Sequence, residues 1–301
     1  MKFVYRFPGR SVPMNLSLQS ADVLTELAIA AEDAGFDAVA FDEHPAPPES
    51  WRRDGYGHDC LDPFVALAAV AAATQRVRLL TNLTVVPYRN PFLLAKTVST
   101  LDVLSKGRVT LGIGTGYLPA EYAALGVDFE RRNAIFDESI AVLKQALIGE
   151  PVTYRGIGFT ADAVTVAPAS VQRPHPPLWI GGNSRLSLRR VAEVGQGWLA
   201  MPGRGNAMIS RRSPALANLS DLDGLITYLR THAEKIERTA PIDILAHTVI
   251  ATDPTDTIKS LQQLRALGVT WTSGGGEGTT VAEAKEAILR YRNEVIDKLR
   301  D

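Results

Sequence analysis

A short pattern recurs four times along the chain: an apolar helical segment ends at a glycine, and a run of apolar and β-branched residues follows at once. The four glycines are Gly35, Gly107, Gly195 and Gly268. Glycine just after a helix adopts left-handed backbone angles without a Cβ penalty, and an uninterrupted apolar run is typical of a strand buried on both faces. The pattern therefore predicts helices that alternate with the strands of a parallel sheet.

Hydrophobic periodicity in the whole chain predicts eight strands, with helical stretches between them. The predicted strands cover residues 2–6, 37–41, 77–85, 108–113, 177–180, 197–200, 243–250 and 269–273. Eight βα units in 301 residues match a closed (β/α)8 barrel, the TIM barrel, whereas an open doubly wound sheet usually has about five to seven strands. No Gly/Ser linker and no block of charge divides the chain, so we expect one α/β domain over residues 1–301.

Two segments interrupt this alternation. Residues 149–176 combine Pro and Gly with alternating Val and Thr, which predicts a hairpin inserted after strand four, between the fourth and fifth units. Residues 201–220 lack periodicity and predict a long loop after strand six. Because loops at the carboxyl ends of barrel strands build active sites, the second insertion is expected to lie beside the site.

The charges of the chain nearly cancel, with 32 basic and 33 acidic side chains. This balance argues against nucleic acid or a membrane surface as the partner and favours a small molecule. The single cysteine, Cys60, excludes an internal disulfide and fits a reducing, cytoplasmic setting. The amino terminus, interrupted by Arg6, Pro8 and Arg10, holds no signal-peptide core, and no apolar stretch reaches the ~18 residues of a membrane span.

Residues just past the strands should converge on one mouth of the barrel. His44 follows the second strand in the run AVAFDEH, where an imidazole can exchange a proton or a hydrogen bond with a ligand near neutral pH. The alternative is a surface histidine held by Glu43. After strand four, LGIGTG has Tyr117 where a dinucleotide-binding fingerprint needs glycine, and it follows the wrong strand for a Rossmann site. Its glycines either let a flat ligand approach the backbone or form a tight turn.

The best candidate for a phosphate site is the sequence IGGNS after strand five, at the start of a helical run. The free amides and the dipole of a helix start can hold an anion, although Ser184 would also serve as an ordinary N-cap. Arg204, in the loop after strand six, can extend the grip on an acidic ligand tail, or it lies in a solvated loop.

A metal site is not expected. His58 and Cys60 lie near Asp59 and Asp62, but no second set of ligands has matching spacing. The lack of an HxH pair after strand one also argues against a metal-dependent barrel hydrolase.

Three blocks of the sequence carry a resemblance to a known family. They are AGFDAVAFDEHP, LDPFVALAAVAAATQRVRLLTNLTVVPYRNPFLLAKTVSTLDVLSKGRVTLGIGTGYLPAEYAALGVDFERR and PPLWIGGNSRLSLRRVAEVGQGWL. Together they resemble the bacterial luciferase-like monooxygenase superfamily and, more narrowly, its oxidoreductases that use the deazaflavin coenzyme F420. The resemblance covers roughly residues 1–200, and the carboxyl third matches only in its rhythm of helices and strands.

The resemblance implies a barrel with the deazaflavin ring across its mouth and a homodimeric assembly. It places His44 beside the ring with Glu43 next to it, and it implies a non-prolyl cis peptide at Asn82–Leu83, against which the ring packs. We expect His44 to be the main catalytic residue, with Glu43 and Tyr117 as the further candidates. The remaining residues expected to bind the cofactor are Gly114, Thr115, Gly116, Gly181, Gly182, Asn183, Ser184, Met201, Gly203 and Arg204.

The expected function is hydride transfer between F420 and a small, apolar organic substrate. Deazaflavin sugar-phosphate dehydrogenases of the superfamily have an acidic catalytic residue at the position of Tyr117, so this departure argues against sugar-phosphate oxidation. An FMN-dependent monooxygenase served by a separate reductase is the alternative, and a non-catalytic relative is a third possibility. Large side chains in the mouth loops either line an apolar pocket or pack loosely: Trp51, Tyr56, Tyr122, Phe129, Met201 and Met208.

Overall fold

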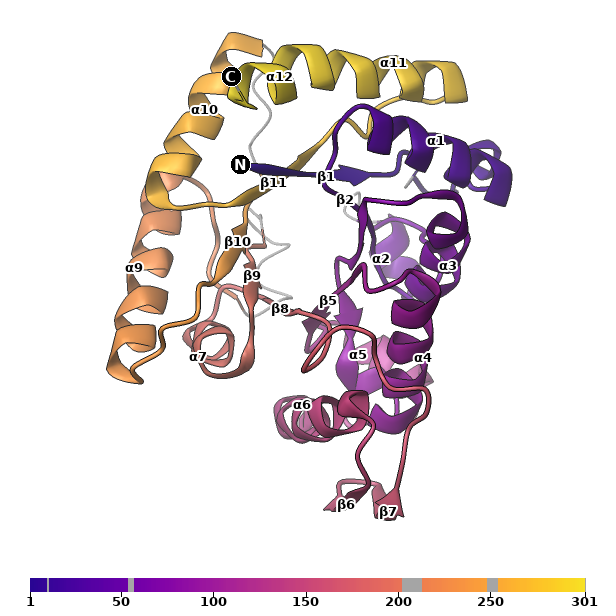
Figure 1. Ribbon diagram of the computed structural model, residues 1–301, viewed down its shortest axis with the longest axis vertical. Coiled ribbons are helices and arrows are strands. Elements are labelled where there is room, and N and C mark those ends of the chain that lie inside the picture. Colours follow the sequence, from indigo (N-terminus) through magenta and orange to yellow (C-terminus); the bar gives the residue numbers. More distant parts are fainter. Residues whose placement is uncertain (10, 54–56, 202–212, 248–253, 301) are drawn as a thin grey trace.

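The computed structural model describes residues 1–9, 11–53, 57–201, 213–247 and 254–300. Its parallel strands close into a barrel that helices surround (Figure 1), which confirms the predicted TIM barrel. The barrel strands are, in spatial order, β1 (Lys2–Arg6), β2 (Ala38–Phe41), β3 (Arg78–Thr81), β5 (Val109–Gly114), β8 (Leu178–Gly181), β9 (Gly197–Leu199), β10 (Asp243–Leu245) and β11 (Trp271–Gly274). Pairing of β11 with β1, which places Trp271 opposite Lys2, completes the circle.

Each barrel strand is followed by a helix on the outside of the barrel. These helices are α1 (Ala21–Asp33), α3 (Pro63–Ala73), α4 (Pro91–Leu104), α6 (Arg132–Ile148), α7 (Arg185–Val194), α9 (Leu219–Lys235), α10 (Pro254–Leu267) and α11 (Val281–Tyr291). Shorter helical segments are η1 (Leu16–Leu18), α2 (Glu49–Arg53), η2 (Val86–Tyr88), α5 (Pro119–Ala124), the π-helical turn η3 (Arg292–Ile296) and α12 (Asp297–Arg300).

The glycine pattern is confirmed at three of its four positions. Gly35, Gly107 and Gly268 have φ angles of 89°, 83° and 98°, in the left-handed region. Gly195 instead has φ −87° at the end of α7, in an extended conformation. A Cβ there would lie 3.2 Å from backbone atoms of Val191, so close packing rather than a left-handed turn explains this glycine.

The third predicted strand, 77–85, is split. It ends as β3, resumes as β4 (Thr84–Val85), and both parts pair with β5, through Leu80 opposite Thr110 and Thr84 opposite Ile113. The Asn82–Leu83 peptide between the two parts is cis.

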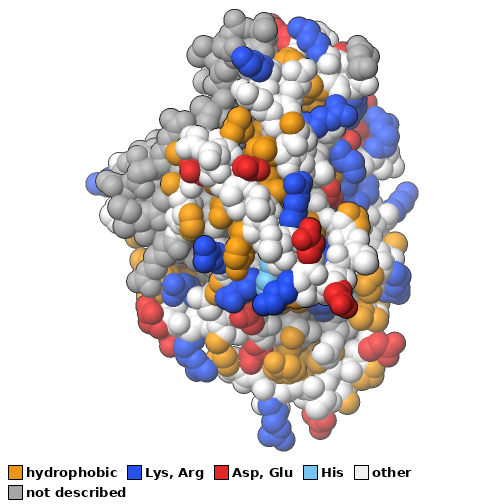
Figure 2. All heavy atoms as spheres, turned by 90° about the vertical axis from the view of Figure 1, so that its left-hand side faces the viewer, with side chains coloured by type: hydrophobic (Ala, Val, Ile, Leu, Met, Phe, Trp, Pro, Cys, Tyr) orange, Lys and Arg blue, Asp and Glu red, His pale blue; other side chains and the backbone are white. Residues whose placement is uncertain are grey.

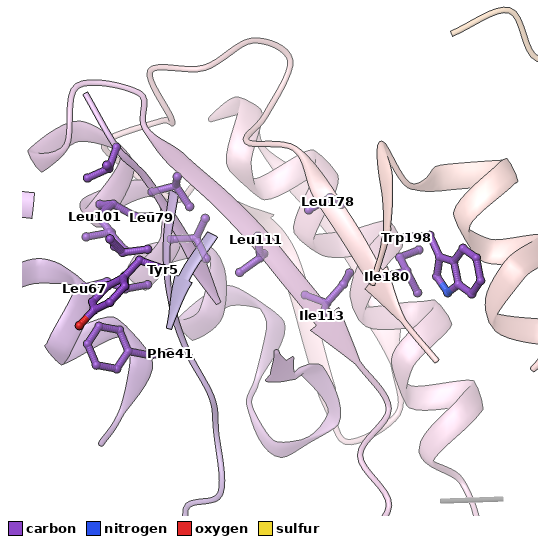
Figure 3. Close-up of a cluster of buried hydrophobic side chains, with 14 of the residues drawn as sticks. Tyr5, Phe41, Leu67, Leu79, Leu101, Leu111, Ile113, Leu178, Ile180 and Trp198 are labelled. Carbon is purple, nitrogen blue, oxygen red and sulfur yellow. The ribbon is translucent and has the colours of Figure 1, made fainter. Parts of the chain in front are cut away.

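Two apolar layers form the core because side chains alternate along each strand. Outward-facing residues such as Tyr5, Leu79 and Leu111 pack under the helices (Figure 3). Inward-facing residues such as Val4 and Leu80 fill the barrel together with Trp179 and Trp271, whose ring centroids are 5.1 Å apart. Burial of each large side chain contributes roughly 1.5–3 kcal/mol, so the barrel forms a stable support for the loops at its mouth.

The predicted hairpin is present as β6 (Val152–Gly156) paired antiparallel with β7 (Phe159–Val164). It packs outside the barrel wall: the Ile157 N–H donates to Glu138 on α6 at 2.7 Å, and the ring of Phe159 lies 5.8 Å from that of Phe92 on α4. The predicted loop 201–220 lies largely outside the described residues.

The surface beside α9 and α10 carries Lys and Arg interspersed with Asp and Glu, without a large area of one charge (Figure 2). Within the described ranges, no helix has the length and apolar composition needed to cross a bilayer.

Candidate functional site

A cavity of about 520 Å³ opens at the carboxyl ends of the barrel strands. Arg6 contributes to it from the end of β1, Gly114 from β5 and Gly181 from β8. Most of the residues expected from the sequence line this cavity: Glu43, His44, Asn82, Leu83, Gly114, Thr115, Gly116, Tyr117, Gly181, Gly182, Ser184 and Met201. The topology thus brings residues that are up to 158 positions apart in sequence to one mouth, from Glu43 to Met201.

One expected residue, Asn183, is not among those that line the cavity, and two others, Gly203 and Arg204, lie outside the described residues. Asn183 is buried behind the wall, where its side chain donates to the carbonyls of Met201 and Pro214 at 2.8 and 2.9 Å and accepts from the Met201 N–H at 2.9 Å. Asn183 therefore ties the loop after β8 to the loop after β9, because its amide satisfies backbone groups that would otherwise be unpaired.

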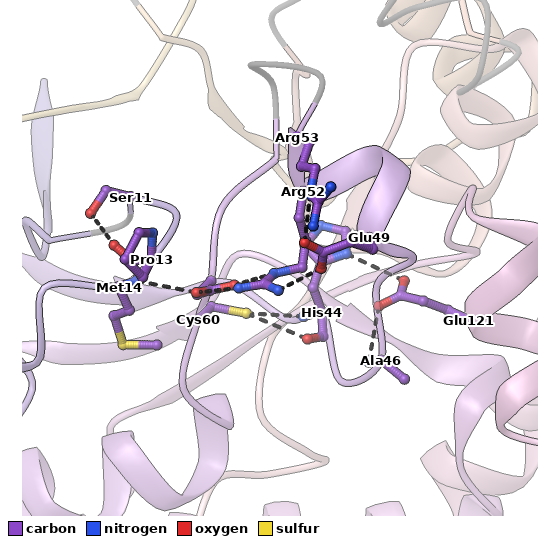
Figure 4. A network of polar contacts seen from close by, with 11 residues as sticks. Ser11, Pro13, Met14, His44, Ala46, Glu49, Arg52, Arg53, Cys60 and Glu121 are labelled. Carbon is purple, nitrogen blue, oxygen red and sulfur yellow. Dashed lines mark hydrogen bonds and ion pairs between the residues drawn. The ribbon is translucent and has the colours of Figure 1, made fainter.

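His44 lies on the wall of the cavity and is held on several sides. Its ring centroid lies 4.3 Å from that of Trp51 and 5.8 Å from that of Tyr117. Its backbone N–H donates to Cys60 Sγ at 3.1 Å, and its Nδ1 lies 3.3 Å from Glu121 Oε2 (Figure 4). The imidazole is therefore positioned rather than free to rotate.

The loop that brings Trp51 against His44 is braced by an arginine. Arg52 on α2 donates to both oxygens of Asp59, at 2.8 and 3.0 Å, and to Glu49 at 2.7 Å (Figure 4). Asp59 also accepts from the Met14 N–H at 3.1 Å, so the loops after β1 and β2 are joined beside the site.

Glu43 does not hold His44, although it precedes His44 in the chain. Its buried carboxylate forms an ion pair with Arg89 and accepts from the Val85 N–H at 2.6 Å. Burial raises the pKa of Glu43, while the charge of Arg89 opposes that change. Neighbouring side chains of an extended segment point to opposite sides, so Glu43 braces β4 instead of contacting the imidazole.

The carboxylate that contacts His44 belongs to Glu121, which sequence reasoning missed. Glu121 lies in the first turn of α5 and is 1% exposed. Its oxygens also accept from the Tyr88 hydroxyl at 3.0 Å and from the Ala46 N–H at 3.3 Å. The sequence did contain a signal for Glu121: it is an acidic residue four positions after Tyr117, in the segment that follows the fourth predicted strand.

The strand-end glycines make room for Leu83. A Cβ on Gly114 would lie 2.8 Å from Leu83 Cδ1, and one on Gly181 would lie 2.3 Å from Leu83 Cδ2. The space over these glycines is thus filled by a side chain of the protein, which differs from the expectation that a flat ligand lies directly on the backbone. Leu83 presents the apolar wall at this point of the cavity.

One end of the cavity reaches the start of α7. Ser184 is an N-cap, as the alternative interpretation expected, and its Oγ accepts from the Ser187 N–H at 3.1 Å. Arg190 is already paired with Asp137 at 2.6 and 2.8 Å. Arg132 stacks on Phe129 with its Cζ 3.9 Å from the ring centroid, and no carboxylate of the described residues pairs with it. Arg132 and the two serines therefore form a cationic, hydrogen-bonding end.

A further part of the cavity lining is polar, unlike the apolar pocket that the loop aromatics predict. Arg6 and His58 both contact Asp42, at 3.0 and 3.1 Å. His247 Nδ1 lies 2.6 Å from Ser273 Oγ. Of the predicted apolar residues, Phe129 and Met201 line the cavity. Tyr122 is fully buried against the carbonyl of Thr115. Tyr56 and Met208 lie outside the described residues.

No cluster of three or more His, Cys, Asp or Glu side chains able to hold a metal ion occurs among the described residues. His58 and Asp59 point to different partners, Asp42 and Arg52.

Comparison with known proteins gives a family match and several relatives. The model of the family described as luciferase-like monooxygenase matches residues 1–257. A protein of Beutenbergia cavernae named F420-dependent glucose-6-phosphate dehydrogenase is 34% identical over 244 residues, which cover 75% of this chain and 70% of that protein.

Solved structures share the fold. A monooxygenase from Streptomyces bottropensis superposes with a TM-score of 0.78 at 21% identity, covering 99% of this chain and 100% of that one. The coenzyme F420-dependent tetrahydromethanopterin reductase from Methanopyrus kandleri has a TM-score of 0.74 at 17% identity, covering 99% of each chain.

Proposed function

The chain belongs to the luciferase-like monooxygenase family, and from that premise we propose that it transfers a hydride between coenzyme F420 and a small organic substrate. The observation that carries the proposal is one cavity in which a fixed histidine, an apolar wall and a cationic end occur together: His44, Leu83 and Arg132. The relatives named for F420-dependent reactions support the choice of coenzyme.

The residues present fit an elongated cofactor with an apolar ring and an anionic tail. Leu83, backed by Gly114 and Gly181, offers a flat apolar surface for the ring. Ser184 and Ser187 at the start of α7, with Arg132 nearby, offer donors and positive charge for a phosphate. When bound, the deazaflavin supplies the hydride chemistry, and the protein supplies position and electrostatics.

His44 is the group proposed to act on the substrate. Trp51 and Tyr117 pack against its ring and Glu121 holds Nδ1, so the imidazole is fixed in one orientation on the cavity wall. A fixed imidazole can exchange a hydrogen bond or a proton with a substrate heteroatom at neutral pH. Arg6, His58 and His247 also line the cavity and favour a substrate that carries polar groups.

Sugar-phosphate oxidation is not part of the proposal. Two relatives, from Beutenbergia cavernae and Nakamurella multipartita, are named F420-dependent glucose-6-phosphate dehydrogenases. The resemblance to the superfamily implies an acidic catalytic residue in such enzymes at the position where this chain has Tyr117.

A test of the proposal compares F420 with its chromophore stripped of the anionic tail. We expect Arg132→Gln to weaken binding of the complete coenzyme about tenfold or more, since a charge-assisted contact contributes roughly 1.5–3 kcal/mol, and to leave binding of the tail-free chromophore nearly unchanged. Quenching of deazaflavin fluorescence measures both affinities. Equal affinities of wild type and variant for the complete coenzyme would contradict the proposed orientation, and no binding of either compound to the wild type would contradict the choice of F420.

A further inference from the structure

We infer that Glu121 is a positioning residue that fixes the proton of neutral His44 on Nδ1 and leaves Nε2 as a hydrogen-bond acceptor for the ligand. The inference adds detail to the proposed function, and it rests on that proposal in one respect: that the cavity binds the substrate. It also names a feature of the substrate: the group that meets His44 must be a donor, such as a hydroxyl or an amine.

Three groups surround the Glu121 carboxylate, and two of them are donors. The Ala46 N–H is a backbone donor 3.3 Å from Oε1. The Tyr88 hydroxyl donates to Oε2 at 3.0 Å. Burial, and then the charge of Glu121, raise the pKa of Tyr88, so this hydroxyl keeps its proton.

The third group is His44 Nδ1, 3.3 Å from Oε2. An ionised carboxylate can only accept hydrogen bonds, and neutral imidazole carries its proton on one nitrogen. A buried contact between an acceptor-only group and Nδ1 is favourable only when Nδ1 bears the hydrogen. Glu121 therefore selects one tautomer, which is the role of the third group in a nucleophile–base–orienter arrangement.

Nε2 then becomes the nitrogen that a ligand meets. No described residue forms a hydrogen bond with Nε2, while the ring itself is fixed by contacts with Trp51, His58 and Tyr117. Because Nε2 of this tautomer has a lone pair and no hydrogen, it accepts from a substrate donor.

Replacement of Glu121 by glutamine should reverse the tautomer. The Ala46 N–H is a backbone donor and cannot become an acceptor, so it keeps the amide oxygen of glutamine at the position of Oε1. The amide NH2 group then takes the position of Oε2, beside Nδ1. The Tyr88 hydroxyl can turn to accept from this NH2, and His44 can accept through Nδ1 only by moving its own proton to Nε2.

The tautomer can be measured without any cofactor, by ¹⁵N NMR of histidine-labelled full-length protein at about pH 8.5, two units above the ordinary histidine pKa. The signals of the five histidines are assigned with His44→Gln, which removes one set. We expect His44 to be protonated on Nδ1 in the wild type and on Nε2 in Glu121→Gln. In the control Tyr88→Phe, which keeps the carboxylate, we expect Nδ1 protonation as in the wild type.

A wild-type His44 protonated on Nε2 would overturn the inference, and this measurement needs no substitution at Glu121, only the assignment variant His44→Gln. An unchanged tautomer in a folded Glu121→Gln protein would overturn it as well. Failure of F420 to bind would instead contradict the proposed function and leave the tautomer result standing, so the two failures are distinguishable.

Discussion

His44 is held by contacts from three separate places in the chain. Trp51 packs on its ring, Cys60 accepts from its backbone N–H, and Glu121 meets Nδ1. A histidine held in this way has lost its rotational freedom before any ligand arrives, so the cost of positioning it is met during folding.

Removal of the imidazole should affect turnover more than cofactor binding. We expect His44→Ala to lower the rate of hydride transfer roughly 100- to 10,000-fold, the usual contribution of a positioned acid–base group, while the affinity for F420 changes far less. Stopped-flow absorbance of the deazaflavin separates the two quantities. The matched control is His232→Ala on α9, where the side chain pairs with Glu193 away from the cavity, and its rate should equal that of the wild type. Equal loss of rate and affinity in His44→Ala would contradict the role.

Glu32 shows how a buried carboxylate stabilises the scaffold. It lies in α1, and its oxygens accept from the backbone N–H groups of Gln75, Arg76 and Val77, at distances down to 2.6 Å. Burial raises the pKa of Glu32, but these three hydrogen bonds outweigh burial and bring the pKa below its ordinary value. The unfolded chain therefore binds this proton more readily than the folded protein does.

The sign of this shift predicts a pH dependence. The stabilisation from Glu32 is fully present above the unfolded pKa of about 4.5 and is lost as the pH falls through the lower, folded value. We expect Glu32→Gln to reduce the free energy of unfolding by about 1–3 kcal/mol at pH 7, because the three N–H groups bond more strongly to an ionised carboxylate than to a neutral amide oxygen. We expect this deficit to shrink in acid. Urea unfolding of the wild type and the variant at several pH values measures this deficit.

The control for that variant is Glu26→Gln on the same helix. Glu26 forms an exposed pair with Lys285 at 2.8 Å, and such pairs contribute about 0–1 kcal/mol. A Glu32→Gln deficit no larger than that of Glu26→Gln, or one that grows in acid, would contradict the account.

Among the elements, the junction of β3 and β4 shapes the cavity most directly. The chain bends there at Asn82–Leu83, and Leu83 fills the space over the ends of β5 and β8. Periodicity predicts one strand across 77–85, because both parts are apolar and both pair with β5. The interruption and the cis peptide could be expected only from the resemblance, since apolar spacing carries no information about peptide isomers.

Gly181→Ala should disturb this junction. Its Cβ would lie 2.3 Å from Leu83 Cδ2, so Leu83 must move, and we expect a loss of about 1–3 kcal/mol in the free energy of unfolding together with weaker F420 binding. Combining it with Leu83→Ala removes the clash, so the double variant should be more stable than the sum of the two single changes predicts. Thermal unfolding of all three proteins tests this, and strict additivity would contradict the packing explanation.

Gly224→Ala provides the matched control. Gly224 lies within α9, where an added Cβ meets no atom within 4 Å. This substitution should raise the free energy of unfolding by about 0.5–1 kcal/mol, since alanine loses less conformational freedom in a helix, and it should leave F420 binding unchanged.

At the scale of the whole molecule, the sequence was sufficient to predict the barrel and most of the residues that line the cavity. Strand number and order follow from periodicity, and parallel strands bring their carboxyl ends to one mouth. The directions of side chains in the mouth loops could not be predicted from the sequence. Glu43 and Glu121 both lie in those loops, and only tertiary contacts decide that Glu43 braces β4 while Glu121 meets His44. Asn183 was likewise expected at the ligand but braces two loops.

The homodimer implied by the resemblance stays a prediction. Light scattering on the purified protein should give twice the chain mass of 32.6 kDa, and a value of one chain mass at micromolar concentration would contradict it.

The central claim is that the cavity at the barrel mouth binds the deazaflavin coenzyme. Its most direct test is a titration of the purified protein with F420 and, separately, with FMN, each in oxidised and reduced form, followed by fluorescence and calorimetry. The account predicts saturable binding of F420 at one site per chain, stronger than binding of FMN, and weakened by Gly181→Ala but not by Gly224→Ala. Tight binding of FMN with no binding of F420 would contradict it and would favour a flavin monooxygenase.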